Sequence, residues 1–295
     1  MTVTIKYDVV TIEEKNYLQM IFAEYVMLLP METIVMHFFA EYEILERSVV
    51  TRLYDKGDKV LEAGTGTGFV TAIIAKTGAD VFTCDPIQAN LDVANLTLRL
   101  NKLESNVSIS CAALGPIDGE ADFYVHNLPY ASSFYPIDAD PEAMEKITVP
   151  VMGVNEVLAE VGANGLHMDI EGGEIALLRV LDFGLINKLS FECHPSIIGD
   201  DTFWDELLPL IEANGFQVVA EAGWFANYPT HNYVVGFERK GHGTEEITHE
   251  ILDDKRTKSK QCDCDNWGKP GVGQQSNDGV DPEEDEPGNR PTQDT

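Results

Sequence analysis

The stretch from Lys59 to Phe69 constrains the fold more than any other part of the chain, because it joins an apolar strand pattern to a glycine-rich turn and then to a helix pattern. Glycines at positions 64, 66 and 68 let the backbone bend sharply and approach a ligand without side-chain obstruction. The helix that follows presents its free N–H groups at the turn. This order predicts the start of an α/β domain with a ligand site at the turn.

The residues around the turn indicate which ligand it takes. A dinucleotide fingerprint reads GxGxxG and seats a pyrophosphate, but here the third glycine comes one residue early and Phe69 holds the sixth position. Glu62 stands just before the turn, where a carboxylate repels a pyrophosphate and attracts an ammonium group. S-adenosylmethionine (SAM) carries such a group, so we predict SAM rather than a nicotinamide cofactor.

A second carboxylate supports the same cofactor. Asp85 ends the next strand pattern, 23 residues after Glu62, where it can accept hydrogen bonds from both ribose hydroxyls. Pro86 then starts the following helix region, where its fixed φ is tolerated. A plain tight turn for the glycines and an ordinary cap for Asp85 are the structural alternatives. The predicted cofactor-binding residues are Glu62, Gly64, Thr65, Gly66, Gly68, Asp85 and Pro86.

Strand and helix patterns alternate from residue 59 onward. The expected strands are 59–63, 80–84, 107–112, 165–170 and 188–193, with 121–125 and 147–151 flanking an irregular loop and 216–221 and 233–238 as an antiparallel pair. The expected helices are 69–76, 87–100, 155–160, 174–181 and 202–214. Successive strands separated by helices require parallel pairing through right-handed crossovers. We predict an α/β, Rossmann-like, seven-stranded and mostly parallel sheet with helices on both faces and the last strand antiparallel.

The chain divides into three predicted segments. Residues 1–57 are expected to form an N-terminal helical segment that packs on the core or covers the cofactor, and residues 58–240 form the SAM-dependent methyltransferase domain. Residues 241–295 are acidic and polar and cannot bury enough apolar surface to offset chain entropy, so we expect a disordered tail. The helical expectation for the first segment rests on apolar residues at helical spacing, namely Ile34, Val35, Phe38, Tyr42 and Leu45.

The charge of the chain is strongly negative. The sequence has 50 acidic and 20 basic residues and a net charge of −30, of which residues 1–240 carry −22. Such a surface repels itself in dilute salt, whereas molar salt screens the repulsion over about 3 Å. The composition is typical of a halophilic protein, with a generally acidic protein as the alternative. Because the chain opens without a secretory signal pattern, we expect a cytoplasmic location.

The run from His167 to Leu178 resembles the D-x-E-G-x-E signature of the FkbM family of SAM-dependent methyltransferases at the end of the fourth core strand. The resemblance covers roughly residues 58–238. It implies methyl transfer from SAM, usually to a hydroxyl of a sugar, a lipid-linked glycan or a secondary metabolite. Weaker supporting pieces are Cys84-Asp85-Pro86, residues 95–107, Ser132-Ser133 and the run 191–195, which resembles the family's E-x-H-P run. The most apolar segment, residues 17–40, is interrupted by Glu24, Pro30 and Glu32 and is a poor membrane span, so we expect no membrane partner.

Four side chains are the candidate catalytic residues, namely Asp169, Glu171, Glu192 and His194. They fall at the carboxyl edge of the predicted sheet, where ligands bind in such folds. Methyl transfer to oxygen needs a proton acceptor; the ordinary pKa of His194 suits that task, and Asp169 can orient the hydroxyl or accept its proton. A structural histidine and helix-capping carboxylates are the alternatives. The same set can hold a hard divalent ion, which is the less favoured hypothesis, and no metal ligands are assigned.

A short run at Asn127 to Tyr130 reads N-L-P-Y and matches the motif of rRNA adenine N6-methyltransferases, in which the Tyr stacks on a flipped base. Nucleic-acid binding draws on a positive surface, whereas residues 110–150 contain one basic residue, Lys146. We therefore expect a glycan or small-molecule acceptor and keep nucleic-acid methylation as the second hypothesis. A SAM-binding protein without activity is the third.

Overall fold

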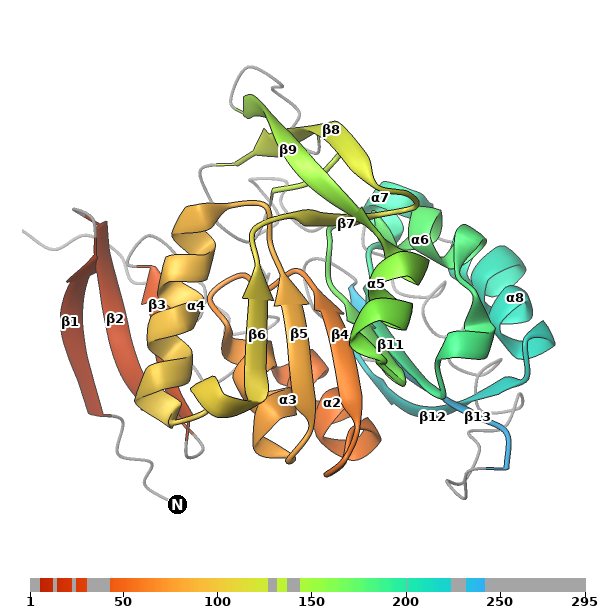
Figure 1. Cartoon of the computed structure of the whole chain (residues 1–295), viewed down its shortest axis with the longest axis horizontal. Helices are drawn as coiled ribbons and strands as arrows, with labels where there is room; N and C mark the ends of the chain where they lie inside the picture. The colour runs from red at the N-terminus through yellow and green to blue at the C-terminus, as the bar shows by residue number, and fades with distance from the viewer. Residues whose placement is uncertain are drawn as a thin grey trace, which may run out of the picture. The chain divides into compact units, whose positions relative to one another are not determined.

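The computed structural model (Figure 1) describes residues 6–12, 15–22, 25–30, 43–126, 132–136, 144–199, 201–223 and 232–241. Of the first three ranges and of Ser196, only the backbone is described. The predicted disordered tail, the N-L-P-Y run and the apolar residues from Ile34 to Tyr42 lie outside the described residues.

A seven-stranded sheet forms the centre of the domain, in the order β12-β13-β11-β10-β4-β5-β6. Each neighbouring pair from β11 to β6 is parallel, and β13 runs antiparallel between β11 and β12. The predicted fold class is therefore confirmed. The strands are β4 (Lys59–Ala63), β5 (Asp80–Cys84), β6 (Val107–Ser110), β10 (Gly165–Met168), β11 (Lys188–Cys193), β12 (Phe216–Ala222) and β13 (Tyr233–Arg239).

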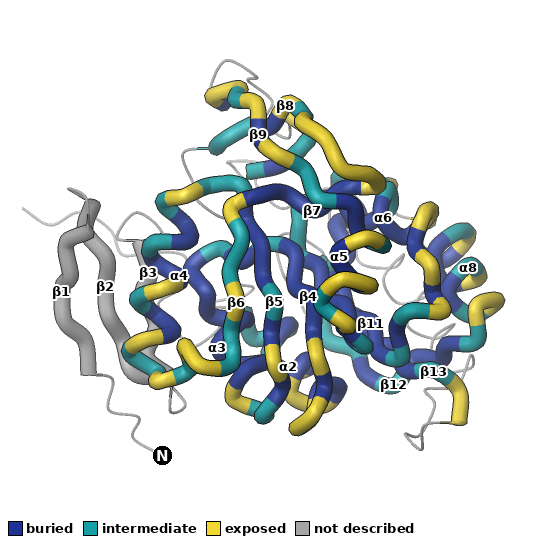
Figure 2. The backbone as a smooth tube through the Cα atoms, in the orientation of Figure 1, coloured by how far each residue is buried: buried dark blue, intermediate teal, exposed yellow. Residues whose placement is uncertain are grey.

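Helices cover both faces of this sheet because successive residues of a strand point to opposite sides. Val60 packs with α2 and α3, whereas Leu61 packs with α5, α6 and α8, and the central strands are buried along most of their length (Figure 2). The helices are α2 (Ile44–Leu53), α3 (Phe69–Lys76), α4 (Gln88–Asn101), α5 (Val154–Val161), α6 (Glu174–Val180), α7 (Pro195–Ile198) and α8 (Leu208–Ala213). A π-helical stretch, Phe203–Leu207, leads into α8.

A second sheet lies beyond the carboxyl ends of β4, β5 and β6 (Figure 1). It consists of β7 (Ala113–Gly115), β9 (Glu145–Gly153) and β8 (Gly119–Val125), in that order, around a small core that includes Phe123 and Val149. The strands expected at 121–125 and 147–151 are confirmed and extended. The three residues of β7 were not predicted, because a strand this short shows no periodicity.

The expectation that residues 1–57 are mainly helical is wrong for residues 6–30. They form an antiparallel three-stranded sheet of β1 (Lys6–Ile12), β2 (Lys15–Phe22) and β3 (Tyr25–Pro30), and a helix follows only at α2. The physical reason is local: the stretch is rich in β-branched and aromatic residues, which favour strands, and only two residues separate each pair of strands. The backbone of β3 lies next to α3 and α4.

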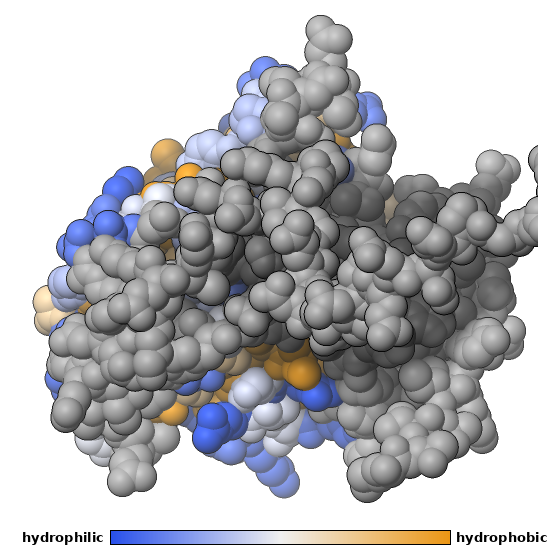
Figure 3. Space-filling model, turned by 180° about the vertical axis from the view of Figure 1, so that it is seen from behind, coloured by the Kyte–Doolittle hydropathy of each residue, from blue (hydrophilic) through white to orange (hydrophobic). Residues whose placement is uncertain are grey.

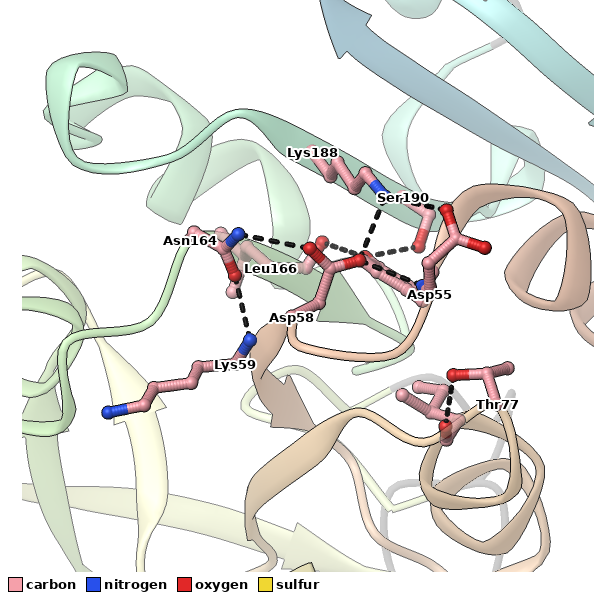
Figure 4. Close-up of polar contacts among 10 residues, drawn as sticks. Asp55, Asp58, Lys59, Thr77, Asn164, Leu166, Lys188 and Ser190 are labelled. Carbon is pink, nitrogen blue, oxygen red and sulfur yellow. Dashed lines mark hydrogen bonds and ion pairs between the residues drawn. The ribbon is translucent and has the colours of Figure 1, made fainter. Parts of the chain in front are cut away.

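A polar network fixes the amino ends of the central strands (Figure 4). Lys188 Nζ lies 2.8 Å from Asp58 Oδ2 and 3.2 Å from Asp55 Oδ2. Asn164 donates its amide to Asp58 Oδ1 at 3.0 Å and accepts from the backbone N–H of Lys59 at 2.7 Å. These bonds join the starts of β4, β10 and β11, so the register that they hold also aligns the opposite ends, where the predicted site residues lie.

Where the described surface is visible from behind, hydrophilic residues alternate with smaller hydrophobic areas (Figure 3). The exposed large apolar side chains among the described residues, Ile117, Tyr135 and Val180, come from separate elements. Within the described ranges, every helix is too short or too polar to cross a membrane.

Candidate active site

A pocket opens at the carboxyl edge of the sheet, beside the ends of β4, β5 and β10. Its empty volume is about 830 Å³, which includes the open mouth. The second sheet and the loop at 132–134 form the opposite wall. The lining residues are Glu43, Gly64–Thr67, Phe69, Val70, Cys84–Ile87, Asn90, Ala113, Leu114, Phe123, Ser132, Phe134, His167 and Asp169–Glu171.

The three glycines of the turn have three different environments. A Cβ on Gly64 would lie 1.9 Å from the backbone oxygen of Asp169, so this glycine lets the turn lie against the end of β10. Gly66 has a φ of +50° and nothing within 4 Å of its Cβ position, so it faces open space. A Cβ on Gly68 would lie 2.8 Å from Ala94, so Gly68 brings α3 against α4 and does not line the pocket.

Asp85 fastens the turn to the end of β5. Its Oδ2 accepts from the backbone N–H of Gly66 at 3.1 Å and its Oδ1 from that of Ile87 at 2.8 Å. The Asn90 amide donates to both oxygens, at 3.3 and 3.2 Å. Burial raises the pKa of Asp85, although these donors lower it. Asp85 and Pro86 both line the pocket, as expected of the ribose end of a nucleoside site.

Glu62 occupies a different place from the one that its sequence position indicates. It is fully buried beneath the turn, its Oε2 accepts from the Thr71 hydroxyl at 2.6 Å, and it does not line the pocket. Burial raises its pKa to about 7. Glu43, at the start of α2, lines the pocket instead. No pattern in the sequence indicates Glu43, because its position depends on how the N-terminal segment reaches the sheet.

The charge of the pocket wall indicates which kind of ligand the pocket binds. Glu43, Asp85, Asp169 and Glu171 line it, and its described lining residues include no lysine or arginine. Burial lowers the pKa of His167 to about 3, so this lining histidine is neutral. A wall of this sign repels a pyrophosphate and attracts a cation. The open face at Gly66 and the carboxylates therefore fit SAM, whose sulfonium and ammonium groups are positive.

The predicted catalytic residues come together beside this pocket, with one addition. His194 Nε2 lies 3.2 Å from Glu192 Oε2, 3.3 Å from Glu171 Oε2 and 3.7 Å from Asp169 Oδ1. Its Nδ1 lies 3.6 Å from Glu174 Oε1, a residue that the signature contains but that was not predicted as part of the site. We call these five residues the acid–histidine cluster. Only Asp169 and Glu171 of the five line the pocket.

Local backbone geometry builds the cluster. After β10 ends, the backbone N–H of Ile170 donates to Glu174 Oε1 at 2.9 Å, which closes the turn before α6. Glu171 has a φ of 52°, an uncommon conformation for a residue other than glycine, and Gly172 follows with a φ of 92°. The buried hydroxyl of Ser133 donates to the backbone oxygen of Glu171 at 2.9 Å, which anchors the loop at 132–136 to the signature.

The electrostatics of the cluster bear on the predicted role of His194. His194 is 2% exposed; burial lowers its pKa, but the carboxylates of Glu174 and Glu192 outweigh this effect and raise it well above its ordinary value. A raised pKa favours the protonated imidazole, which has no free lone pair, so this environment disfavours His194 as the base, and that role stays a prediction. Burial raises the pKa of Glu171 to about 8.

The sheet order, the glycine turn and the negative pocket at the carboxyl edge together define a SAM-dependent methyltransferase of the Rossmann-like class. The family profile described as the methyltransferase FkbM domain matches residues 62–218, more than half of the chain. The chain therefore belongs to the FkbM methyltransferase family.

One curated protein matches a short stretch of the chain. The protein-L-isoaspartate O-methyltransferase of Chromobacterium violaceum is 49% identical over 45 residues, which cover 15% of this chain and only 20% of that relative.

Among solved structures, ribosomal protein L11 methylase from Lactobacillus delbrueckii is 16% identical, with 68% of this chain and 79% of that one covered and a TM-score of 0.41. A Streptococcus pneumoniae protein in complex with SAM is 13% identical, with coverages of 69% and 75% and a TM-score of 0.38. These likenesses carry no argument about the methyl acceptor.

Proposed function

We propose that this protein transfers the methyl group of SAM to a hydroxyl oxygen of a sugar, a glycan or another small molecule. The observation that carries the proposal is that the glycine turn, Asp85 and the carboxylates of Asp169 and Glu171 line one pocket. When bound, SAM supplies an electrophilic methyl group on a sulfonium.

The cofactor half of the pocket is assigned to the turn and the end of β5. Gly66 and Thr65 let the backbone approach the ligand, and Asp85 accepts from the ribose hydroxyls in place of the long, shared contacts of the Asn90 amide. Glu43 takes the role first expected of Glu62, since a carboxylate on the wall can pair with the ammonium group and a buried one cannot.

The acceptor hydroxyl must lose its proton as its oxygen bonds to the methyl carbon. Asp169 and Glu171 are the carboxylates on the wall that can orient the hydroxyl and accept this proton. Glu192 and His194 lie behind them, and the His194 Nε2 atom, 3.2 to 3.7 Å from the carboxylates of Glu192, Glu171 and Asp169, holds their orientation.

The opposite wall suits a neutral acceptor. The rings of Phe123 and Phe134 meet edge to face, with centroids 5.4 Å apart, and Ser132 adds a hydroxyl. Aromatic faces and a small polar group bind sugar rings and small apolar molecules and exclude water. A net charge of −30 and a pocket without basic residues in its described lining disfavour RNA, so nucleic-acid methylation stays the second hypothesis.

The test uses the full chain in molar KCl with SAM labelled on its methyl group and a host lysate separated into glycan, small-molecule and RNA fractions. We expect label in a glycan or small-molecule fraction, and loss of labelling in Asp169→Asn and Glu171→Gln variants that still bind SAM in calorimetry. Label in the RNA fraction alone would contradict the proposed acceptor. A folded wild-type chain that does not bind SAM would contradict the proposed activity itself.

A further inference from the structure

The acid–histidine cluster gathers more negative charge than a buried site holds without a counter-ion. Asp169, Glu171, Glu174 and Glu192 all lie within 4.0 Å of His194, and among the described residues no other cationic group pairs with them. Burying several carboxylates around one imidazole carries a large desolvation cost that a single positive charge does not offset. The buried Glu46 lies near enough to Asp169 and Glu192 to add to the repulsion.

Several polar atoms of the cluster also lack hydrogen bonds that would stabilise their burial. Both ring nitrogens of His194 and the Oδ1 of Asp169 are buried and have no hydrogen-bond partner among the described residues. His194 is 2% exposed, and its ring points into the carboxylates at distances of 3.2 to 3.7 Å. Buried polar atoms are rarely left unpaired, so an unpaired histidine aimed at carboxylates indicates a missing partner.

The spacing of these atoms matches the ligands of a metal ion. Oxygen and nitrogen ligands at about 2.0–2.5 Å from a divalent ion lie roughly 3–4 Å apart at adjacent positions and about 4–5 Å apart at opposite ones. The contacts of His194 fall in the first range, and ligand atoms of Asp169, Glu174 and His194 all lie within 4.8 Å of one another. The Glu192 contact, at 3.2 Å, lies at the outer end of the usual N–H···O range of about 2.7–3.2 Å, and the other three contacts are longer.

We propose that the acid–histidine cluster binds one divalent first-row transition-metal ion, with His194 and Asp169 as ligands and the remaining coordination from the neighbouring glutamates. The sequence alone assigns no metal ligands, because the five residues come from two strand ends and one helix start. A mixed set of imidazole and carboxylates suits ions such as Mn²⁺, Fe²⁺ or Zn²⁺ better than Mg²⁺ or Ca²⁺, which prefer oxygen alone.

The position of the site gives the ion a role in the reaction, and this role rests on the proposed function. Asp169 and Glu171 line the pocket, so an ion bound to them lies beside the acceptor. An alcohol oxygen coordinated to the ion has a lowered pKa. Its proton then passes to a pocket carboxylate, and its lone pair forms the bond to the methyl carbon as the carbon–sulfur bond breaks.

The test measures metal binding directly, without SAM or an acceptor. The chelator-treated full chain is titrated with Mn²⁺ in molar KCl, and free and bound Mn²⁺ are separated by electron paramagnetic resonance. Mn²⁺ is the probe because thiolates bind it poorly, which leaves Cys111, Cys262 and Cys264 out of the result. Molar KCl screens the acidic surface, which would otherwise collect ions without a site.

We expect one Mn²⁺ per wild-type chain, and a loss of affinity of about tenfold or more in both Asp169→Asn and His194→Gln. Glu238→Gln is the matched control: Glu238 is also buried, but it lies opposite Lys188 in the β11–β13 ladder, at the amino end of β11, so Mn²⁺ binding should be unchanged. Circular dichroism and SAM calorimetry establish that each variant is folded.

Two results would overturn the proposal: no Mn²⁺ binding by the folded wild-type chain, or binding that both cluster variants retain, which would show adventitious surface ions only. SAM binding and methyl transfer are measured on the same samples. A chain that methylates its acceptor without binding Mn²⁺ refutes the metal site and leaves the proposed function intact. A chain that binds Mn²⁺ but not SAM refutes the proposed function and leaves the metal site intact.

Discussion

Replacing Glu62 by glutamine should stabilise the protein, and the size of the effect follows from the burial of this carboxylate. Glu62 is fully buried, has one hydrogen bond, from Thr71, and leaves its Oε1 unpaired among the described residues. Burial raises its pKa from 4.5 to about 7. Glutamine keeps the shape and can still accept from Thr71, but it has no charge to desolvate.

The sign of the pH dependence follows from the raised pKa. Below about pH 4.5, Glu62 is protonated in both the folded and the unfolded chain, so its ionisation does not lower the free energy of unfolding. As the pH rises through about 7, the unfolded chain has already released this proton, so the folded state loses stability. The shift corresponds to about 3 kcal/mol at mildly alkaline pH. Glu62→Gln should recover a large part of this free energy there and little at acidic pH.

The assay is urea unfolding followed by circular dichroism, over a series of pH values at constant molar KCl and without SAM. Other carboxylates titrate in the same range, so the quantity of interest is the difference between wild type and variant at each pH. Glu120→Gln, an exposed residue on β8, is the control and should change the free energy of unfolding by less than about 0.5 kcal/mol. A Glu62→Gln variant that is less stable than wild type at alkaline pH, by an amount independent of pH, would refute the reasoning.

Gly64→Ala should unfold the domain, because the added Cβ would lie 1.9 Å from a backbone oxygen. Gly66→Ala should cost about 1–2 kcal/mol of stability and weaken SAM binding. Equal stability of the two variants in urea would contradict the different environments assigned to the two glycines. Asp85→Asn should lower SAM affinity about tenfold or more in calorimetry, and an unchanged affinity would remove Asp85 from the site. Lys188→Ala should lower the free energy of unfolding in urea by about 3–5 kcal/mol, because it leaves the buried Asp58 carboxylate without its cation. The SAM affinity of the folded fraction should stay unchanged. The melting temperature should rise from dilute to molar KCl, and a flat profile would argue against a halophilic protein.

The N-terminal segment and the cluster show where local patterns stop being informative. Residues 6–30 carry strand-forming residues, yet apolar spacing further along the segment favoured helix, and the two signals cannot be weighed without knowing which surface the segment covers. The position of Glu62 before the turn predicts a ligand contact, but its side chain turns beneath α3. The charge state of His194 likewise depends on four carboxylates that no sequence spacing places around it.

By itself, the sequence determined the cofactor class and, apart from the short β7 and α7, the order of strands and helices from residue 59 onward, because strand and helix periodicity and the glycine turn are local properties of the chain. It also marked the strand ends that carry Asp85, Asp169 and His194. Only the tertiary structure decided which carboxylates face the pocket, that Glu43 joins them, and that His194 lies among four acids. Those outcomes depend on distances between segments far apart in the chain, and both pKa and coordination geometry depend on such distances.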